Sequence, residues 1–441
     1  MSFDDHRPPE RALVDDCVHC GFCLPSCPTY ALWGQEMDSP RGRVHLIAQA
    51  LDGAPLAGPV MAHMDSCLSC MGCLTSCPSG VKYDRLVTAT RAQIERQVRR
   101  PPGERAARAL IFGLFPHPRR LRAARAALVA AEASGLRRAL RHPSIAARLP
   151  PVVRAMESVA PPPGPYQRLG GRVPAASPRR GTVAMLTGCV QRVFFSPVNA
   201  ATARVLAAEG FDVEIPRAQG CCGALSGHAG REEEAVRYAK ATIDAFSASG
   251  ADKVIVNAAG CGSAMKEYGH LLSDEPGYAE RARQFSARVR DLSEFLVEVG
   301  PRAPRHPLQA TVAYHDACHL AHAQGIRDAP RALLDAIPGL ERREIADGQL
   351  CCGSAGVYNL LQPGPAGELG DRKVANVRAT GAGALVTANP GCTMQIRAAA
   401  ERGGWSIAAY HIAEVLDASV RGAQLGDRLG ATQPQRCKTL S

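Results

Sequence analysis

Two copies of one cysteine pattern constrain this chain more than any other feature. Residues 17–28 read C-V-H-C-G-F-C-L-P-S-C-P, and residues 67–78 read C-L-S-C-M-G-C-L-T-S-C-P. Both are C-x2-C-x2-C-x3-C-P, the spacing that holds cubane iron–sulfur clusters. Thiolates are soft ligands that select such clusters or zinc, and zinc sites usually take two cysteine pairs separated by a longer loop. We therefore expect two 4Fe–4S clusters.

The ligand sets of these clusters are expected to be crossed, because the fourth cysteine of each run usually ligates the other cluster. One set is Cys17, Cys20, Cys23 and Cys77, and the other is Cys67, Cys70, Cys73 and Cys27. Gly21 and Gly72 lie inside the loops, where a residue without a Cβ lets the backbone approach a cluster and permits positive φ. Pro28 and Pro78 then turn the chain away.

Length and composition limit the remaining possibilities. At 441 residues the chain is long enough for about three domains. Residues 1–10 are charged and have no apolar stretch, which argues against a signal peptide and for a reducing, cytoplasmic compartment in which the 17 cysteines bind metals or do redox chemistry. No run of 18 apolar residues exists to span a membrane. Aromatic residues make up 5% of the chain and offer no stacking platform for nucleic acid.

The net charge of +11 is concentrated in one segment. Residues 99–180 contain 17 Arg, no Lys and three acids. Two interpretations stay open. The segment docks an acidic partner or anionic lipid, which would give peripheral association with the inner face of the cytoplasmic membrane. Alternatively, it is a solvated Arg/Ala-rich helical linker, as charge runs usually are.

From residue 181 the chain repeats itself with a period of about 130 residues. The paired positions are Cys189 with Cys318, Cys221-Cys222-Gly223 with Cys351-Cys352-Gly353, and Cys261 with Cys392. Apolar runs (182–189, 253–261, 311–318 and 384–392) alternate with helical patterns such as 199–209 and 231–247. This alternation predicts parallel α/β units. The cysteines then fall near the carboxyl ends of strands, where open α/β sheets place their ligand sites.

The expected fold class is α+β overall, with five parts. They are a helical ferredoxin-type two-cluster module (1–100), a basic helical segment with a Pro/Gly linker (101–180), a first Cys-Cys-Gly repeat (181–305), a second (306–420) and a polar tail (421–441).

Local signals predict helices within these parts. Ser39 should cap a helix that begins at Pro40. Residues 84–100 should form another, with Val87, Ile94 and Val98 facing inward, until Pro101 stops it. A helical stretch is expected over 119–141 and no regular structure over 161–180, which is rich in Pro and Gly.

The cysteines of the repeats are candidates for a further metal, cluster or redox site. They are Cys189, Cys221, Cys222, Cys261, Cys318, Cys351, Cys352 and Cys392. The alternative is that they are small buried residues, but the same arrangement occurring twice argues against coincidence. His315, His319 and His322 surround Cys318, and each is a candidate ligand, proton carrier or quinone contact, with His319 the most suggestive; His228 follows the first Cys-Cys-Gly. The alternative for each is an ordinary core or surface histidine. Cys437 in the tail has no assigned role.

The chain resembles the iron–sulfur subunits of flavin-linked 2-hydroxy-acid dehydrogenases, and most of all the glycolate oxidase iron–sulfur subunits. The stretches that carry the resemblance are V-D-D-C-V-H-C-G-F-C-L-P-S-C-P-T-Y (14–30), S-P-R-G-R (39–43), Q-G-C-C-G-A-L-S-G-H-A-G (219–230), N-A-A-G-C-G (257–262), Y-H-D-A-C-H-L (314–320) and A-N-P-G-C (388–392). The basic segment lies outside it. In one departure, Ala264 and Gln395 stand where many Cys-Cys-Gly proteins end a C-x-x-C, which argues against disulfide-cleaving clusters.

The resemblance implies an electron-transfer subunit of a glycolate oxidase. A partner FAD subunit would oxidise glycolate, and electrons would pass through the two 4Fe–4S clusters to an acceptor such as a quinone. This chain has no G-x-G-x-x-G after a strand, so we expect FAD on the partner only and no catalytic residue here. Alternatives are the iron–sulfur subunit of a lactate or glycerol-3-phosphate dehydrogenase, a disulfide or quinone reductase acting at the repeats, and a structural zinc-binding scaffold.

Overall fold

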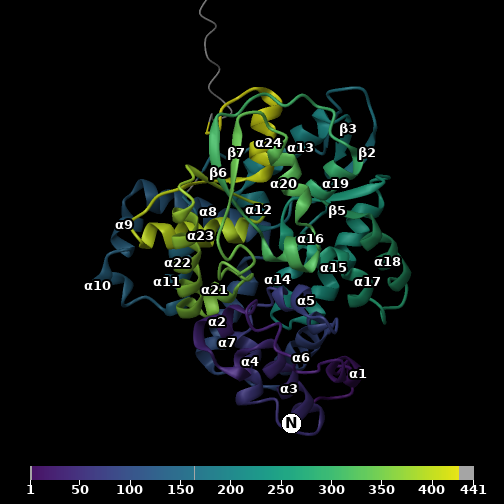
Figure 1. The fold of residues 1–441 in the computed structure, drawn as a ribbon, viewed down its shortest axis with the longest axis vertical. Helices are drawn as coiled ribbons and strands as arrows, with labels where there is room; N and C mark the ends of the chain where they lie inside the picture. Colours follow the sequence, from purple (N-terminus) through teal and green to yellow (C-terminus); the bar gives the residue numbers. More distant parts are fainter. Residues whose placement is uncertain (1, 163, 427–441) are drawn as a thin grey trace, which may run out of the picture.

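The computed structural model describes residues 2–162 and 164–426. The cysteine runs lie in a helical module at one end of the long axis, and two sheets lie beyond it (Figure 1). The module consists of α1 (Arg11–Asp15), α2 (Pro28–Trp33), the 3₁₀ turn η1 (Glu36–Asp38), α3 (Pro40–Leu51), α4 (Pro59–Ser66), α5 (Gly72–Ser76) and α6 (Tyr83–Gln97). Cys437 lies outside the described residues.

The predicted helix starts in this module are largely confirmed. The side chain of Ser39 accepts a hydrogen bond from the backbone N–H of Gly42, and Pro40 is the first residue of α3. The second helix, α6, begins within one residue of its predicted start and buries Val87 and Ile94. It ends at Gln97 rather than residue 100, because Val98 already has an extended backbone, and Val98 is only partly buried.

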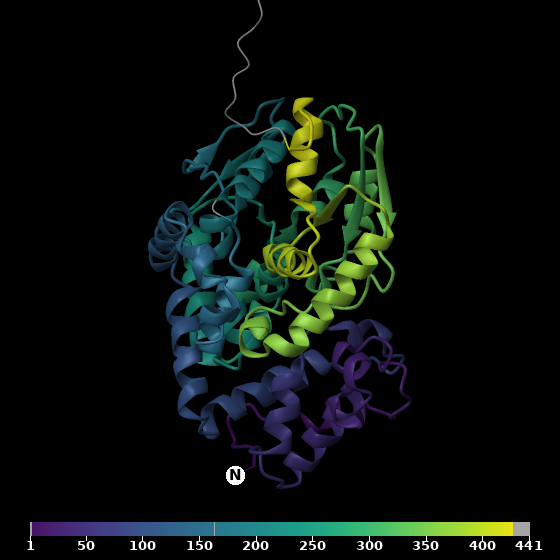
Figure 2. The ribbon, with the colours of Figure 1, turned by 90° about the vertical axis from the view of Figure 1, so that its left-hand side faces the viewer.

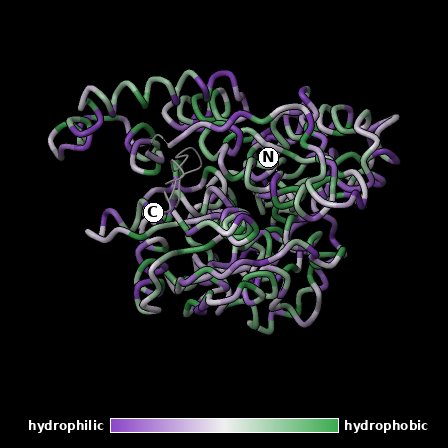
Figure 3. Tube along the Cα trace, turned by 90° about the horizontal axis from the view of Figure 1, so that it is seen from above, coloured by the Kyte–Doolittle hydropathy of each residue, from purple (hydrophilic) through white to green (hydrophobic). Residues whose placement is uncertain are grey.

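The basic segment is helical, as predicted. Its helices are α7 (Pro102–Leu114), α8 (Pro118–Ala133), α9 (Leu136–Leu140), α10 (Pro143–Ala146) and α11 (Pro151–Val159). The single stretch expected over 119–141 is wrong, because Gly135 adopts φ +74° and separates α8 from α9. Helices α9 and α10 project from the body (Figure 1), and the protruding part of the tube carries both hydrophilic and hydrophobic residues (Figure 3).

This segment is not a fully solvated linker. Leu121 of α8 packs against Cys189 and Cys221 of the first repeat. Arg100 and Arg108 are buried and pair with carboxylates at 2.7 Å, to Asp65 and Glu95. Part of the positive charge is therefore neutralised inside the chain, and α8 covers the first set of repeat cysteines.

Each repeat contains one sheet flanked by helices, as the alternating pattern predicts. The first comprises β1 (Arg172–Val173), β2 (Gly181–Met185), α12 (Val190–Phe194), α13 (Ser196–Ala208), β3 (Phe211–Glu214), α14 (Ala224–His228), α15 (Glu232–Ser247), β4 (Lys253–Val256), α16 (Ala259–Lys266), α17 (Tyr268–Leu271), α18 (Ala279–Arg288), β5 (Val289–Asp291) and α19 (Leu292–Val299). Strand β1 lies in 161–180, where no regular structure was expected. It pairs antiparallel with β3, a partner that local composition does not reveal.

The second repeat follows the same order. It comprises β6 (Ala310–His315), the π-helical segment η2 (His319–Ala323), α20 (Asp328–Asp335), β7 (Leu340–Glu344), α21 (Tyr358–Leu361), α22 (Pro363–Ala379), β8 (Ala384–Thr387), α23 (Pro390–Arg402), β9 (Ala408–His411) and α24 (Ile412–Arg421). The strand order is β1-β3-β2-β4-β5 in one sheet and β7-β6-β8-β9 in the other, and every pair except β1·β3 is parallel. The predicted α+β class is confirmed.

The two sheets share one hydrophobic core. Buried residues of both belong to a single cluster, including Val183 and Val213 of the first sheet and Val312 and Leu385 of the second. Helix α24 of the second repeat packs on α13 of the first, and α20 of the second packs on α19 of the first. In Figure 2, α24 (yellow) stands between the teal strands and the green strands. The repeats thus form one body.

No helix among the described residues is both long and apolar enough to cross a membrane.

Candidate metal centres

Four cysteines from both runs surround a small cavity inside the N-terminal module. Cys27, Cys67, Cys70 and Cys73 are all buried and line a cavity of about 20 Å³. We call these four the inner set. Cys27 comes from the first run and the other three from the second. This is the crossed combination expected for one cluster, and four thiols around one centre suit the donor set of a cubane cluster.

The electrostatics of the inner set vary from one thiol to the next. Burial raises the pKa of Cys70 and of Cys73. Burial also opposes ionisation of Cys67, yet Arg43 and Arg91 lower its pKa below the usual value. Its Sγ also accepts hydrogen bonds from the Tyr83 hydroxyl at 3.5 Å and the Ser69 N–H at 3.4 Å. Hydrogen bonds to sulfur and nearby cations favour an anionic centre.

The S-P-R-G-R stretch at the start of α3 explains much of this environment. Ser39 and Pro40 begin the helix. A Cβ at Gly42 would overlap the carbonyl oxygen of Glu36, so glycine is required there. Arg41 reaches the first cysteine loop, where its Nη1 donates to the carbonyl oxygen of His19 at 2.8 Å. The stretch therefore serves both cysteine runs at once, since Arg43 points to the inner set.

Arg43 is 1% exposed and lies beside the inner set. Its Nη1 is 3.9 Å from Cys27 Sγ and donates to the Asp38 carbonyl oxygen at 2.6 Å. Its Nη2 contacts Asp38 Oδ1 at 3.2 Å and donates to the Ser66 hydroxyl at 2.8 Å. A buried cation needs such partners. Asp38 balances part of its charge while the guanidinium still faces sulfur.

The other four cysteines lie nearer the surface. Cys17, Cys23 and Cys77 are half-buried and Cys20 is exposed, and we call these four the outer set. Cys17, Cys23 and Cys77 pack against the same apolar cluster of the module. Burial raises the pKa of Cys23, and the neighbouring thiols of Cys17 and Cys27 add to that rise. The two sets therefore lie side by side.

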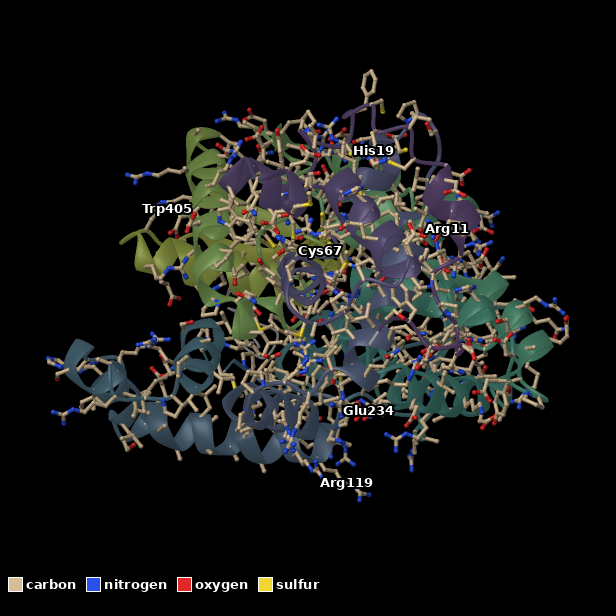
Figure 4. All side chains as sticks on the ribbon, turned by 90° about the horizontal axis from the view of Figure 1, so that it is seen from below. Arg11, His19, Cys67, Arg119, Glu234 and Trp405 are labelled. Carbon is tan, nitrogen blue, oxygen red and sulfur yellow. The ribbon has the colours of Figure 1, made fainter. Side chains whose placement is uncertain are left out.

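The two runs also meet directly. The hydroxyl oxygens of Ser26 and Ser76, each just before the fourth cysteine of its run, are 2.6 Å apart. In Figure 4 the first loop, marked by His19, lies at the edge of the view, whereas Cys67 lies toward the centre. One run thus contributes mainly to an exposed site and the other to an interior one.

The backbone of the loops departs from the sequence expectation at one position. Gly21 adopts φ +89°, and a Cβ there would lie 2.8 Å from Arg41 Nη1. In the second loop positive φ values belong to Ser69 at +49° and Met71 at +63°, not to Gly72. Gly72 instead begins α5, where a Cβ would lie 3.0 Å from the carbonyl oxygen of Ser26. Its role is therefore close approach between the runs.

The structure brings together the four cysteines of the first repeat. Cys221 interacts with Cys189 and Cys222, and Cys222 with Cys261. The thiol contacts raise the pKa of Cys221 and Cys261, with burial adding to the rise, whereas they lower the pKa of Cys222. Four thiols held together in this way offer the donor set of a thiolate metal site.

In the second repeat the histidine nearest a cysteine pair is His315, which the sequence named as a candidate, and not the preferred His319. Ligand atoms of His315, Cys352 and Cys392 all lie within 4.8 Å of one another, and all three residues are buried. Both ring nitrogens of His315 are buried without a hydrogen-bond partner in the described part of the chain. Cys318 Sγ lies 4.0 Å from Cys351 Sγ. His315 ends β6, and the aligned position of the first repeat is Leu186, a difference that could have favoured His315 over His319.

His319 and His322, the other two histidines around Cys318, have different surroundings. His319 Nδ1 is 3.5 Å from Cys318 Sγ, and its ring meets the edge of His228 with centroids 4.7 Å apart. His322 is held between the Thr75 hydroxyl at 2.8 Å and the Gln349 carbonyl oxygen at 3.0 Å. His322 therefore connects α5 to the second repeat rather than facing a cysteine pair.

The inner set touches the second repeat. Cys70, Cys318 and Cys351 belong to one cluster of buried residues, together with Leu68 and Tyr358. The thiol of Cys318 contributes to the raised pKa of Cys70, and Cys70 in turn contributes to the raised pKa of Cys351. The sequence places these residues some 250 positions apart and gives no sign of this contact.

Family models match the parts of the chain in the same order. A model described as 4Fe-4S dicluster domain matches residues 13–81, and one described as cysteine-rich domain matches 183–266 and 312–397. A third, described as the linker region of the glycolate oxidase iron-sulfur subunit, matches 103–160. The expectation that the basic segment lies outside the family resemblance is therefore wrong.

Curated relatives extend over nearly the whole chain. The probable glycolate oxidase iron-sulfur subunit of Bacillus subtilis (strain 168) is 40% identical over 91% of this chain and 93% of its own length. The glycolate oxidase iron-sulfur subunit of Escherichia coli (strain K12) is 36% identical, with 90% and 94% covered. Lactate utilization protein A of Halalkalibacterium halodurans is 34% identical over 53% of this chain and 96% of its own length.

Proposed function

The chain belongs to the family of glycolate oxidase iron–sulfur subunits, and we propose that it carries electrons from a partner FAD subunit, which oxidises glycolate, to an acceptor such as a quinone. One observation carries the proposal: eight cysteines form an outer set at the surface and an inner set in contact with the second repeat. That arrangement leads from solvent to the interior, as an electron carrier requires.

The proposed ligand sets are Cys17, Cys20, Cys23 and Cys77 for the outer cluster, and Cys27, Cys67, Cys70 and Cys73 for the inner one. The small cavity shared by the inner four supports the crossed assignment. Bound 4Fe–4S clusters would supply one-electron carriers whose potentials depend on burial, charge and hydrogen bonds to sulfur.

The residues around the two cysteine sets would decide the order in which electrons pass through them. The loop at Cys20 would receive electrons from the partner, because Cys20 is exposed. Arg43 and the hydrogen bonds to Cys67 favour added negative charge at the inner set. Electrons would then move inward, toward Cys318 and Cys351.

We further propose that the second repeat holds a metal ion through Cys352, Cys392 and His315, and that Cys189, Cys221, Cys222 and Cys261 form an all-thiolate site in the first. Thiolate and imidazole ligands together suit zinc or iron. The unpartnered ring nitrogens of His315 support its inclusion, since buried polar atoms are normally satisfied. The proposed domain limits stay 1–100, 101–180, 181–305, 306–420 and 421–441, with β1 (Arg172–Val173) joining the sheet of the first repeat from outside its limit.

The test is anaerobic purification with co-expressed flavin subunits, followed by electron paramagnetic resonance after addition of glycolate or lactate. We expect about eight irons with acid-labile sulfide in the N-terminal module, and cluster signals that appear with glycolate. Signals that appear only with lactate would favour a lactate dehydrogenase subunit instead, a candidate supported by the lactate utilization relatives. Zinc without iron would eliminate electron transfer and leave the structural scaffold.

A further inference from the structure

A cavity of about 540 Å³ lies between the N-terminal module and the first repeat. Its walls include Met71 and Leu74 of the second cysteine run, Cys222 of the first repeat, and the histidines His228 and His319. We propose that this cavity is the acceptor site and that it binds the headgroup of a neutral quinone. The inference rests on the proposed function and gives the acceptor a location in the fold.

The position of the cavity fits an acceptor. Met71 stands between two ligands of the inner set, Cys70 and Cys73, and Cys222 belongs to the cysteine group of the first repeat. A molecule in the cavity therefore lies against the loops of two candidate metal centres. Electron transfer requires that donor and acceptor lie close together. The volume of the cavity is within the ordinary range of about 300–1,000 Å³ for small-molecule sites.

The charges around the cavity favour a neutral ligand. Two arginines line it among the described residues, and both are paired: Arg7 with Asp274 at 2.8 Å and with Glu232 at 3.0 Å, and Arg85 with Glu267 at 2.6 Å. A carboxylate substrate or a nucleotide phosphate would need a cation that is free to pair with it. A 2-hydroxy acid and a flavin nucleotide therefore fit poorly, whereas a quinone carries no charge.

The two histidines supply the polar contacts that a quinone needs. The rings of His228 and His319 meet edge to face with centroids 4.7 Å apart. His319 Nε2 is buried and has no hydrogen-bond partner in the part of the chain that the structure describes. An imidazole N–H can donate to a quinone carbonyl oxygen, while Leu74 and Ala92 provide apolar wall for the ring.

The reaction balances with the electrons that the proposed function provides. Oxidation of one 2-hydroxy acid on the partner releases two electrons, which arrive one at a time. The quinone takes up both electrons and two protons, so that its two C=O groups become C–OH and a quinol leaves. Solvent supplies the protons at the mouth of the cavity, where Thr88 and His270 are exposed.

The test fills the cavity from α6. Ala89→Trp replaces a small lining residue, Thr88→Trp does the same at the mouth, and Ala126→Trp, at an exposed position of α8, is the matched control. The co-purified, iron-loaded complex is reduced with dithionite and reoxidised with menadione, a naphthoquinone, or with ferricyanide, which reacts at exposed centres. Menadione binding to the oxidised protein is measured by calorimetry.

We expect both cavity variants to slow reoxidation by menadione about tenfold or more and to weaken its binding, while ferricyanide rates and the control stay unchanged. Wild-type menadione rates and affinity in both variants would overturn the acceptor site. A wild-type complex that holds no reducible cluster would instead contradict the proposed function, and calorimetry would still report whether the cavity binds a quinone.

Discussion

The two cysteine loops have the same spacing but opposite surroundings. In the first loop Val18 and Phe22 are each 68% exposed, and Cys20 lies at the surface. At the corresponding place in the second loop, Leu68 is 4% exposed and packs with Tyr358 and the cysteines of the second repeat. The same cysteine spacing thus occurs in one loop that is open to solvent and in another that is enclosed by the protein.

This difference teaches that the cysteine spacing determines which metal centre a loop can hold, whereas the residues around the loop determine how exposed and how charged that centre is. Exposed apolar side chains next to a redox centre are typical of a docking surface. A buried centre next to a guanidinium is suited to accept charge. Four experiments test how far this contrast holds.

The largest effects are expected from ligand loss. Cys20→Ser and Cys70→Ser should each lower glycolate-dependent reduction of a quinone or dye by more than about 100-fold, since disturbing even the residues around metal ligands costs 10–100-fold. Flavin reduction by glycolate, followed by its absorbance, should be unchanged. Full turnover in both variants would contradict electron transfer through the two sets.

The second-largest effect is expected from chelation, which should remove iron from the two cysteine sets at different rates. An iron chelator added to the oxidised protein should remove about four of eight irons in a fast phase and the rest at least about tenfold more slowly, because local opening exposes the outer set more readily. The Cys20→Ser variant should lose the fast phase. A single phase in the wild-type protein would mean that burial does not distinguish the sets.

Arg43→Gln should lower the midpoint potential of the inner cluster by on the order of 100 mV, because a cation about 4 Å away stabilises the reduced state. Arg41→Gln, on the same helix but directed to the first loop, is the matched control. Redox titration followed by electron paramagnetic resonance distinguishes the two clusters. Equal shifts in both variants would show that Arg43 has no special effect on the inner set.

The smallest expected effect concerns docking. Phe22→Asp should weaken capture of the flavin subunit roughly fivefold, as for loss of a moderate interface contact. Iron content and the spectra of both clusters should stay as in the wild type. Val297→Asp, at an exposed apolar residue of α19, is the control. Unchanged affinity for the flavin subunit would remove the first loop from the interface.

Much of the architecture could be predicted from the sequence, because local patterns determine it. The helix start at Ser39 follows from a side-chain cap and a proline, and the duplicated sheets follow from apolar runs that recur at one period. What could not be predicted depends on contacts between distant residues. The approach of Cys70 to Cys318, the pairing of β1 with β3, and the cover that Leu121 gives to Cys189 are all of this kind.

The candidate site shows the same limit. Cysteine spacing was sufficient to propose both ligand sets, since each run is local. The choice of His319 over His315 rested on its place next to Cys318, but side-chain direction decides which imidazole faces a cysteine pair. His315 is the last residue of a strand, and its ring points toward Cys352 and Cys392, whose loops come from later in the chain.

The reciprocal packing of helices between the two repeats has a consequence for the ancestry of the chain. Helix α24 packs on α13, and its counterpart α19 packs on α20. The last helix of each repeat therefore contacts the other repeat. Arg204 and Asp417 join the first of these pairs with two contacts of 2.8 Å. Reciprocal contacts of this kind are those of a two-fold symmetric dimer. The cysteine-rich half of the molecule has the form of a homodimer whose two protomers now share one polypeptide.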